Sequence, residues 1–463
     1  MAGYSKTSIS LKYGVALGAL ISGMAAMSGT AQAQTVPATN PVGTVTNVNS
    51  VAIGPNSSVL GGTSVAVGSG AFVNGGNSTA VGSGANIIGN NNVAVGLSAS
   101  AKTAAGTAVQ SSVAIGSSAA AQANNAVAVG FNSQAATTGS TAVGTETKAT
   151  GNNATAYGAG AVSAGDNSLA TGYLANASGG YSIASGNQAT SSGASSSALG
   201  ANSVASGEAA VAVGSKAYAT GSNSIAIGGM KNNTAGSDLG TNAKNVNTIA
   251  IGSGAEASGQ HAVSLGLQST ASGDSSIALG RASSASGGNS SAFGLSSVAA
   301  GGNSTALGRN AEARADGSTA LGFNSIANET NTISVGSSVQ NGQNAPFQRR
   351  ITNVAAGINT YDAANYGQVS AVQDQVTTLR SDFNDFKQET RSGIAATAAM
   401  ANPIMPSAPG KISVAANMAA FHGEVGLGTA FAYRPTVAPT IFQGGLAYAG
   451  KEAIVRVGIS TEF

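Results

Sequence analysis

Two histidines and many serines are the residues of this 463-residue chain whose types could do hydrolytic chemistry. A serine beside a histidine is the arrangement of a nucleophilic hydrolase, in which the imidazole takes the hydroxyl proton. However, His261 falls in a predicted turn and His422 at the end of a predicted strand, and serine is so frequent that a pair would arise by chance. Gly68-Ser69-Gly70 lacks the strand-to-helix context of a phosphate loop. No His, Asp and Glu residues have metal-ligand spacing. We therefore predict no enzyme activity, no catalytic residue, no cofactor and no metal site.

Charged residues in one irregular stretch are better candidates for binding. Residues 229–247 (GMKNNTAGSDLGTNAKNVN) contain Lys231, Asp238 and Lys244 in a chain of which only 8% is charged. Insertions on a rigid scaffold are where binding residues tend to lie, although a tolerated, neutral insertion explains the stretch equally well. The formal net charge of +2 gives no reason to expect nucleic acid as a partner.

The scaffold that must position these residues is a repeat. The phrases SVAIG, SVAVG and STAVG end at Gly54, Gly68 and Gly82, and the closing glycine returns every 14 residues up to Gly336. The spacing is broken twice, by a step of 20 residues before Gly116 and a step of 24 before Gly252. A fixed, short period indicates a solenoid with one coil per repeat, and the extra residues are expected to leave it as loops.

Each coil is predicted to hold two short strands and two tight turns. In Ile225-Ala226-Ile227-Gly228, branched residues alternate with a small one, which is the period of a β-strand. A second glycine often follows seven residues after the first, as at Gly221. We expect the face of small residues to be where another copy of the chain packs. Close packing between layers is the alternative explanation for the small residues.

The N-terminus has the pattern of a secretory signal peptide over residues 1–33. Lys6 and Lys12 flank the start of an apolar run at 13–27, and an A-x-A site predicts cleavage between Ala33 and Gln34. A buried N-terminal helix is the alternative. No later stretch is apolar enough to predict a transmembrane helix.

The repeats fill residues 34–346, which we call the head. A different segment follows at residues 347–367, and a helix is predicted over 368–401. Its apolar residues alternate steps of three and four, which predicts the core of a short coiled coil. These residues are Val369, Val372, Val376, Leu379, Phe383 and Phe386. The helix then becomes rich in small residues, with Gly393 in core register, which suits a confined space.

The last segment, 402–463, contains four stretches of about ten residues in which apolar residues alternate with small or polar ones such as Arg456. This is the pattern of strands in an outer-membrane β-barrel. Four strands cannot close a barrel, and an open sheet edge is not tolerated in lipid. Two chains would give eight strands with no room inside for helices, whereas three would give twelve strands around three thin helices. We therefore predict a homotrimer anchored in membrane lipid.

These features together resemble the YadA-type trimeric autotransporter adhesins of Gram-negative bacteria, from the head repeats to the segment ITNVAAG and the four final strands. The resemblance implies a mainly β fold: a trimer of left-handed parallel β-rolls, a short trimeric coiled-coil stalk and a 12-stranded transmembrane β-barrel with four strands per chain. It also implies that the barrel exports the head to the cell surface, and that Phe463 helps the barrel-insertion machinery of the outer membrane to recognise the anchor. The chain departs from the family pattern at Asn417, where glycine often faces the pore helices.

The resemblance implies attachment to extracellular-matrix proteins such as collagen or fibronectin through many weak contacts. The phrase associated with such binding corresponds here to Asn49, Ser50, Val51, Ala52, Ile53 and Gly54. The alternative for each of these residues is that it only builds the coil. A second functional hypothesis is that the heads bind each other and cause autoaggregation and biofilm formation, because residues 34–101 contain no charge.

Overall fold

The computed structural model describes residues 43–47, 49–230, 240–340 and 345–461, which fall into two units divided after Arg349. The predicted signal peptide, with Ala33 and Gln34, lies outside the described residues, as do Lys231, Asp238 and Phe463. No helix within the described ranges is both long and apolar enough to cross a membrane.

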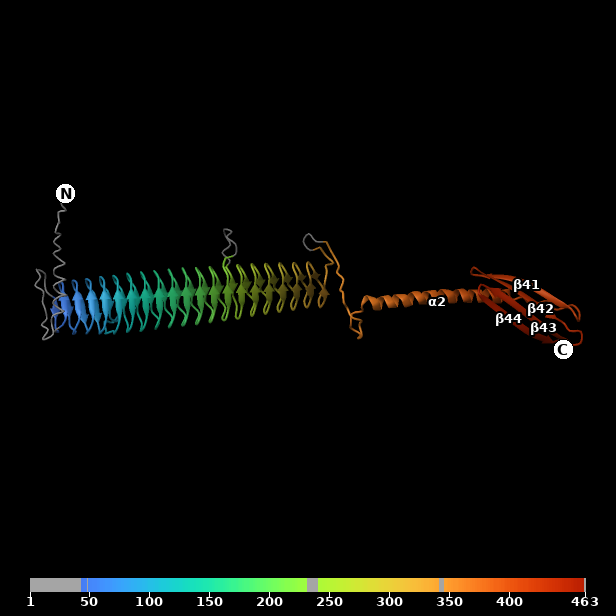
Figure 1. The fold of residues 1–463 in the computed structure, drawn as a ribbon, viewed down its shortest axis with the longest axis horizontal. Coiled ribbons are helices and arrows are strands. Elements are labelled where there is room, and N and C mark those ends of the chain that lie inside the picture. The colour runs from blue at the N-terminus through green and yellow to red at the C-terminus, as the bar shows by residue number, and fades with distance from the viewer. Residues whose placement is uncertain (1–42, 48, 231–239, 341–344, 462–463) are drawn as a thin grey trace, which may run out of the picture. The chain divides into compact units, whose positions relative to one another are not determined.

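The first unit is a stack of coils that form two parallel sheets (Figure 1). Each coil has one strand in each sheet, and neighbouring coils pair in register, so that Val211 lies beside Ile225 and Ala212 beside Ala226. The first sheet pairs its strands in chain order. Its strands are β2 Val51–Ile53, β4 Val65–Val67, β6 Thr79–Val81, β8 Val93–Val95, β10 Val113–Ile115, β12 Val127–Val129, β14 Thr141–Val143, β16 Thr155–Tyr157, β18 Leu169–Thr171, β20 Ile183–Ser185, β22 Ser197–Leu199, β24 Val211–Val213, β26 Ile225–Ile227, β28 Ile249–Ile251, β30 Val263–Leu265, β32 Ile277–Leu279, β34 Ser291–Phe293, β36 Thr305–Leu307, β38 Thr319–Leu321 and β40 Ile333–Ser334.

The second sheet takes the shorter strand of each coil. Its strands are β1 Thr44–Val45, β3 Ser58–Val59, β5 Phe72–Asn74, β7 Asn86–Ile88, β9 Ser100–Ala101, β11 Ala120–Ala121, β13 Gln134–Ala135, β15 Lys148–Ala149, β17 Val162–Ser163, β19 Asn176–Ala177, β21 Thr190–Ser191, β23 Val204–Ala205, β25 Tyr218–Ala219, β27 Asn242–Ala243, β29 Glu256–Ala257, β31 Thr270–Ala271, β33 Ser284–Ala285, β35 Val298–Ala299, β37 Glu312–Ala313 and β39 Ile326–Ala327. We call the connection from the first sheet to the second, such as 214–217, the first turn, and the returning connection, such as 220–224, the second turn.

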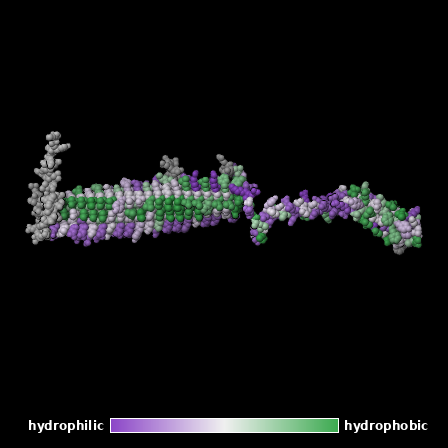
Figure 2. Space-filling view, in the orientation of Figure 1, coloured by the Kyte–Doolittle hydropathy of each residue, from purple (hydrophilic) through white to green (hydrophobic). Residues whose placement is uncertain are grey.

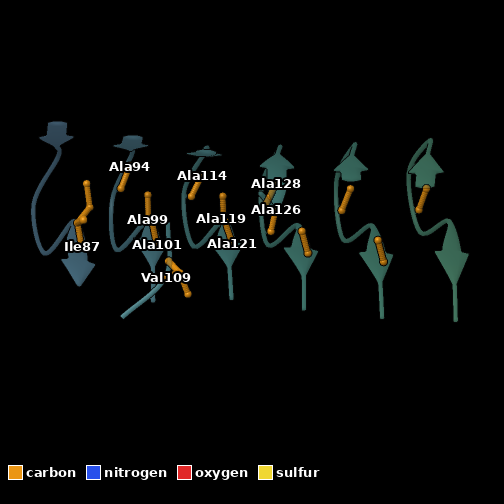
Figure 3. Close-up of a cluster of buried hydrophobic side chains, with 14 of the residues drawn as sticks. Ile87, Ala94, Ala99, Ala101, Val109, Ala114, Ala119, Ala121, Ala126 and Ala128 are labelled. Atoms are coloured by element: carbon orange, nitrogen blue, oxygen red, sulfur yellow. The ribbon is translucent and has the colours of Figure 1, made fainter. Parts of the chain in front are cut away.

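The core of this unit is the narrow space between the two sheets, and small side chains fill it. Ala114 of the first sheet and Ala121 of the second are both fully buried, and Figure 3 shows such side chains pointing into the space between the two rows of strands. The expectation that another copy packs on the small-residue face is therefore wrong. The alanines face the chain's own second sheet, which approaches so closely that only small residues fit, and the branched residues point outward.

The closing glycine of each coil is required by both backbone conformation and space. Gly68 has φ +131°, which side-chain-bearing residues rarely adopt, and a Cβ there would lie 2.5 Å from the carbonyl oxygen of Gly82 in the next coil. The repeating glycine therefore sets how closely the coils can stack.

Neither irregular step disturbs the pairing of the coils on its two sides. Across the first, Val93 still pairs with Val113. Across the second, Tyr218 pairs with Asn242 and Ile225 with Ile249. The second insertion therefore occupies a first turn.

The second unit contains helix α2, Tyr366–Ala399, and one antiparallel sheet. Asn365 caps the helix: its side chain accepts the Gln368 backbone N–H at 3.0 Å, and the Gln368 side chain accepts the Asn365 N–H at 3.2 Å. The sheet has four ten-residue strands in chain order, as the sequence predicts, namely β41 Ile412–Phe421, β42 Glu424–Tyr433, β43 Thr440–Ala449 and β44 Glu452–Thr461.

Alanines at the end of α2 pack on one face of this sheet. Ala395 and Ala399 are fully buried, and Cβ atoms at Gly426 and Gly428 would lie 2.4 and 2.2 Å from the carbonyl oxygens of these two alanines. The opposite face of the sheet exposes large apolar side chains such as Leu427. Four strands with two unpaired edges and an apolar outer face are consistent with one chain's share of a barrel.

Candidate functional site

The head presents two different outer faces. On the first sheet, the residues on either side of the buried middle residue point outward and are mostly Val, Ile, Leu or Thr, which we call the apolar face. Many of its large side chains are exposed in the single chain, and Figure 2 shows a hydrophobic band running along the head. The exposed members are Val81, Ile115, Tyr157, Ile183, Leu199, Ile227, Leu265, Ile277, Leu279, Leu307, Leu321 and Ile333. An exposed apolar surface of this extent marks an interaction site.

The second sheet presents mostly polar residues to the outside, with a minority of apolar ones such as Val162 and Val204. Gln134, Lys148, Asn176 and Thr190 occupy corresponding outward positions in successive or nearby coils. The hydrophobic effect thus favours burial of the apolar face against a partner more than burial of the second sheet. The polar face and the turns are left as the surface that a ligand in water would meet.

The phrase at residues 49–54 divides into outward and structural residues. Asn49 is exposed at φ 67°, and Val51 and Ile53 point outward from the first sheet. Ser50 is buried, where its hydroxyl donates to the Gly61 carbonyl at 3.1 Å and accepts the Ser64 N–H at 3.2 Å.

The other two residues of that phrase also have structural environments. Ala52 packs against the core, and a Cβ at Gly54 would lie 2.8 Å from the carbonyl of Gly68. Only Asn49, Val51 and Ile53 therefore have side chains that point outward, and Val51 and Ile53 belong to the apolar face. The ligand-binding role of the phrase stays a prediction.

Lys244 does not belong to the insertion in which the sequence places it. The chain rejoins the second sheet at β27, so that Lys244 follows that strand in a second turn, whereas the insertion leaves from a first turn. Its Nζ lies 2.5 Å from Oε1 of Glu256, one coil further on. The structure therefore separates Lys244 from the insertion that contains Lys231 and Asp238.

The predicted coiled-coil core lies on one stretch of α2 without any covering contact in the single chain. Its six residues are all more than half exposed: Val369, Val372, Val376, Leu379, Phe383 and Phe386. Six large apolar side chains at steps of three and four leave a seam that needs a partner helix.

The anchor residues differ in what they contact. Arg456 donates from Nη2 to Oδ1 of Asn402 at 2.9 Å, on the face of the sheet that holds α2. Asn417 pairs with Gly428, whose own missing side chain leaves room for α2, but Asn417 itself is exposed. Gly393 has open space where a Cβ would be, because it lies away from the buried alanine side of the helix.

A clamp at the last coil was not predicted from the sequence. Arg349 donates from Nη1 to the Val335 carbonyl at 2.6 Å and from Nη2 to the Phe323 carbonyl at 2.5 Å. Its guanidinium lies 4.5 Å from the centre of the Phe347 ring, and Phe347 forms a bridge with Ser337. The clamp covers carbonyls at the end of the stack. The Arg349-Arg350 pair, directly after the repeat fades, is the one signal that could have indicated it.

The segment before α2 is held by the side chains of Gln368 and Asp362. Gln368 bonds Gly357 twice, accepting its N–H at 2.9 Å and donating to its carbonyl at 3.0 Å. The Asp362 carboxylate accepts the backbone N–H groups of Asn359 at 2.9 Å and Ile358 at 3.0 Å. These bonds, that from Asn359 foremost, lower the pKa of Asp362 below its usual 3.8.

The two histidines belong to separate units and to turns. His261 has φ 56° in a second turn, and His422 has φ 48° between β41 and β42, where its ring meets Phe421 edge-on. In the described ranges, no group of three His, Asp or Glu side chains could hold a metal ion.

The fold and its two faces define the first unit as a β-solenoid with one apolar interaction face. A family model for the YadA head domain repeat matches more than half of the chain. The matched residues are 46–71, 60–85, 110–133, 135–161, 149–175, 163–189, 177–203, 205–229, 243–269, 257–283, 285–311 and 313–338. The chain belongs to the YadA-like family of trimeric autotransporter adhesins, a family of proteins that are not enzymes.

Among solved structures, the chain is similar to the collagen-binding domain of the Yersinia adhesin YadA. The identity is 23%, the match covers 43% of this chain and 87% of that chain, and the TM-score is 0.25. No curated protein matches the chain.

Proposed function

We propose that three copies of this chain assemble into one surface adhesin, with the apolar faces of the three heads packed together. The exposed hydrophobic side chains of the first sheet support this assembly, because burying apolar area gives about 25 cal/mol per Å². The exposed seam on α2 and the unpaired edges of the four-stranded sheet need partners as well. One assembly of three copies satisfies all three requirements.

In this proposal the anchor is a barrel of twelve strands in the outer membrane, and the small-residue end of α2 lies inside it. The buried alanines of α2 against Gly426 and Gly428 support this, because the helix lies on the face opposite the large apolar side chains. The signal peptide at 1–33 directs the chain out of the cytoplasm, and the head reaches the cell surface through the barrel.

The head attaches the cell to matrix proteins, and collagen and fibronectin are the first candidates. The observation that supports attachment most directly is the in-register stack, which repeats the same backbone arrangement of strands and turns along the whole head. Weak contacts multiplied over coils and over three chains give high avidity.

The number of coils provides the test. The full chain is displayed on a non-adherent Gram-negative host, and attachment to immobilised collagen and fibronectin is measured. Deletion of residues 155–210 removes four whole coils and joins Ala154 to Val211, which occupies the same coil position as Thr155. We expect saturable attachment that falls severalfold in this variant while surface display is unchanged. Absence of attachment to both proteins would remove the matrix-adhesion proposal.

Self-association of heads is the second candidate, because residues 34–101 contain no charged residue. Contacts between such surfaces are not screened by salt. Sedimentation of displaying cells at two salt concentrations tests this in the same strain. Rapid, salt-insensitive clumping without matrix attachment would identify the protein as a cell-aggregation device.

A further inference from the structure

At two places along the head, the two turn edges carry residues of opposite charge at nearly matching heights. On the first-turn edge, Arg281 and Arg309 are exposed, each directly after a closing glycine. On the second-turn edge, Asp274 and Asp316 are exposed, and the Oδ1 atoms of these aspartates accept the backbone N–H of the preceding coil, from Gln260 at 2.9 Å and Gly302 at 2.7 Å. These bonds hold both carboxylates on that edge.

Seven residues, or half a coil, separate each arginine from one aspartate. Strand spacing in a sheet is about 4.8 Å, so the members of each pair differ in height by roughly 2.4 Å. The two members lie on opposite edges of their own roll. In the described ranges, the ion pairs of the head are Lys244 with Glu256 and Arg314 with Glu312, and neither involves these four residues.

Three-fold rotation about an axis along the head brings unlike edges together. When the apolar faces point to the axis, the first-turn edge of one copy lies beside the second-turn edge of the next, and every residue keeps its height. We propose that Arg309 pairs with Asp316 of the adjacent copy and Arg281 with Asp274 of the adjacent copy. The inference rests on the proposed trimer and adds the residues that set its register.

The order of arginine and aspartate along the chain is reversed between the two pairs, and the two pairs together therefore fix the register in which adjacent copies align. We call this arrangement the register lock. Asp316 follows Arg309 in the chain, whereas Asp274 precedes Arg281. If one copy slides by one coil in either direction, one pair survives and the other aspartate is replaced by a glycine, either Gly288 or Gly302. Only the unshifted register satisfies both. Nearly identical coils would otherwise pack equally well after a slip, and a few polar residues commonly remove such degeneracy.

Engineered cysteines test the pairing directly, because the natural chain has none. In the full chain, purified in detergent, Arg309→Cys with Asp316→Cys is expected to give covalent trimers on a denaturing, non-reducing gel. Arg309→Cys with Asp274→Cys is the matched control, since two and a half coils, roughly 12 Å of height, exceed the reach of a disulfide. Trimers that fail to cross-link at the first pair, or that cross-link equally at both, would overturn the inference.

Charge reversal gives a second measurement that does not depend on disulfide geometry. Arg281→Asp with Arg309→Asp places like charges at both contacts, and we expect the melting temperature of the head to fall by roughly 2–4 °C. Adding Asp274→Arg and Asp316→Arg is expected to restore it. Equal melting of all three proteins contradicts the lock. A chain that is monomeric in detergent would instead refute the trimer itself, so the two failures are distinguishable.

Discussion

Gly294→Ala is expected to open the head locally, whereas Gly288→Ala in the same coil is not. Gly294 has φ +134°, and a Cβ there would lie 2.5 Å from the Gly308 carbonyl oxygen. Backbone strain of this kind costs about 1–3 kcal/mol, and relieving the collision weakens a ladder hydrogen bond worth about 1 kcal/mol. The expected loss is about 2–4 kcal/mol per chain. At Gly288 a Cβ would meet nothing within 4 Å, and Ala194 occupies the same position in another coil.

Trypsin measures the opening, because Arg281 and Arg309 flank the coil. When cleavage tracks the population of the open state, about 3 kcal/mol corresponds to roughly a hundredfold faster cutting. We expect that increase for Gly294→Ala and a rate within about twofold of the parent for Gly288→Ala. Equal cutting of the two variants would show that the closing glycine is not what limits coil spacing.

Three further outcomes are expected in the second unit. The lowered pKa of Asp362 means that its stabilising hydrogen bonds are fully present above its unfolded pKa of 3.8 and are lost as pH falls through the lower folded value. The protection of the Ile358 amide, measured as its exchange rate relative to the intrinsic rate at each pH, should therefore be lost only in strong acid, and a loss of protection near pH 6 would contradict the assignment. Gln368→Leu removes the capping box and should lower the free energy of opening the first turn of α2 by about 1 kcal/mol. Amide exchange at the start of the helix measures this change, and unchanged protection there would count against the capping role. A Cβ at Gly426 would lie 2.4 Å from the Ala395 carbonyl oxygen, so Gly426→Val should reduce surface display of the head, measured by antibody labelling. A Cβ at Gly458 would meet open space, so Gly458→Ala should leave display unchanged. Equal display of the two variants would contradict the packing of α2.

The period could be predicted from the sequence, but not which way each strand faces. In Ile225-Ala226-Ile227, alternation assigns the two faces equally well to inside and outside. The direction is decided by the second strand of the coil, where Ala219 faces Ala226 across a gap that admits only small residues. This packing of one strand against the other depends on the tertiary structure, and the residue pattern of a single strand does not predict it.

Lys244 illustrates a different limit. Its stretch differs from the repeat in length, so the whole stretch was interpreted as one loop, yet Asn242-Ala243 re-forms a strand with the same pairing as Tyr218-Ala219. Alignment of that dipeptide with the other second strands would have found the boundary. The Arg349 clamp is less accessible to such reasoning, because its acceptors, the carbonyls of Phe323 and Val335, are backbone groups that carry no signal in the sequence.

Three separate surfaces in the part of the chain that the structure describes have no partner within that part, and they constrain the assembly differently. The apolar face of the head and the seam on α2 both need copies of the chain, but neither by itself sets how many. The four-stranded sheet does, because eight strands leave no interior space for helices and twelve do. In the proposed assembly the anchor therefore sets the number of copies, while the head, whose coils are nearly alike, needs its own means of aligning those copies. Without further contacts, nearly identical coils would pack equally well after a slip of one coil. The arginines and aspartates on the two edges of the head supply contacts that distinguish the unshifted alignment.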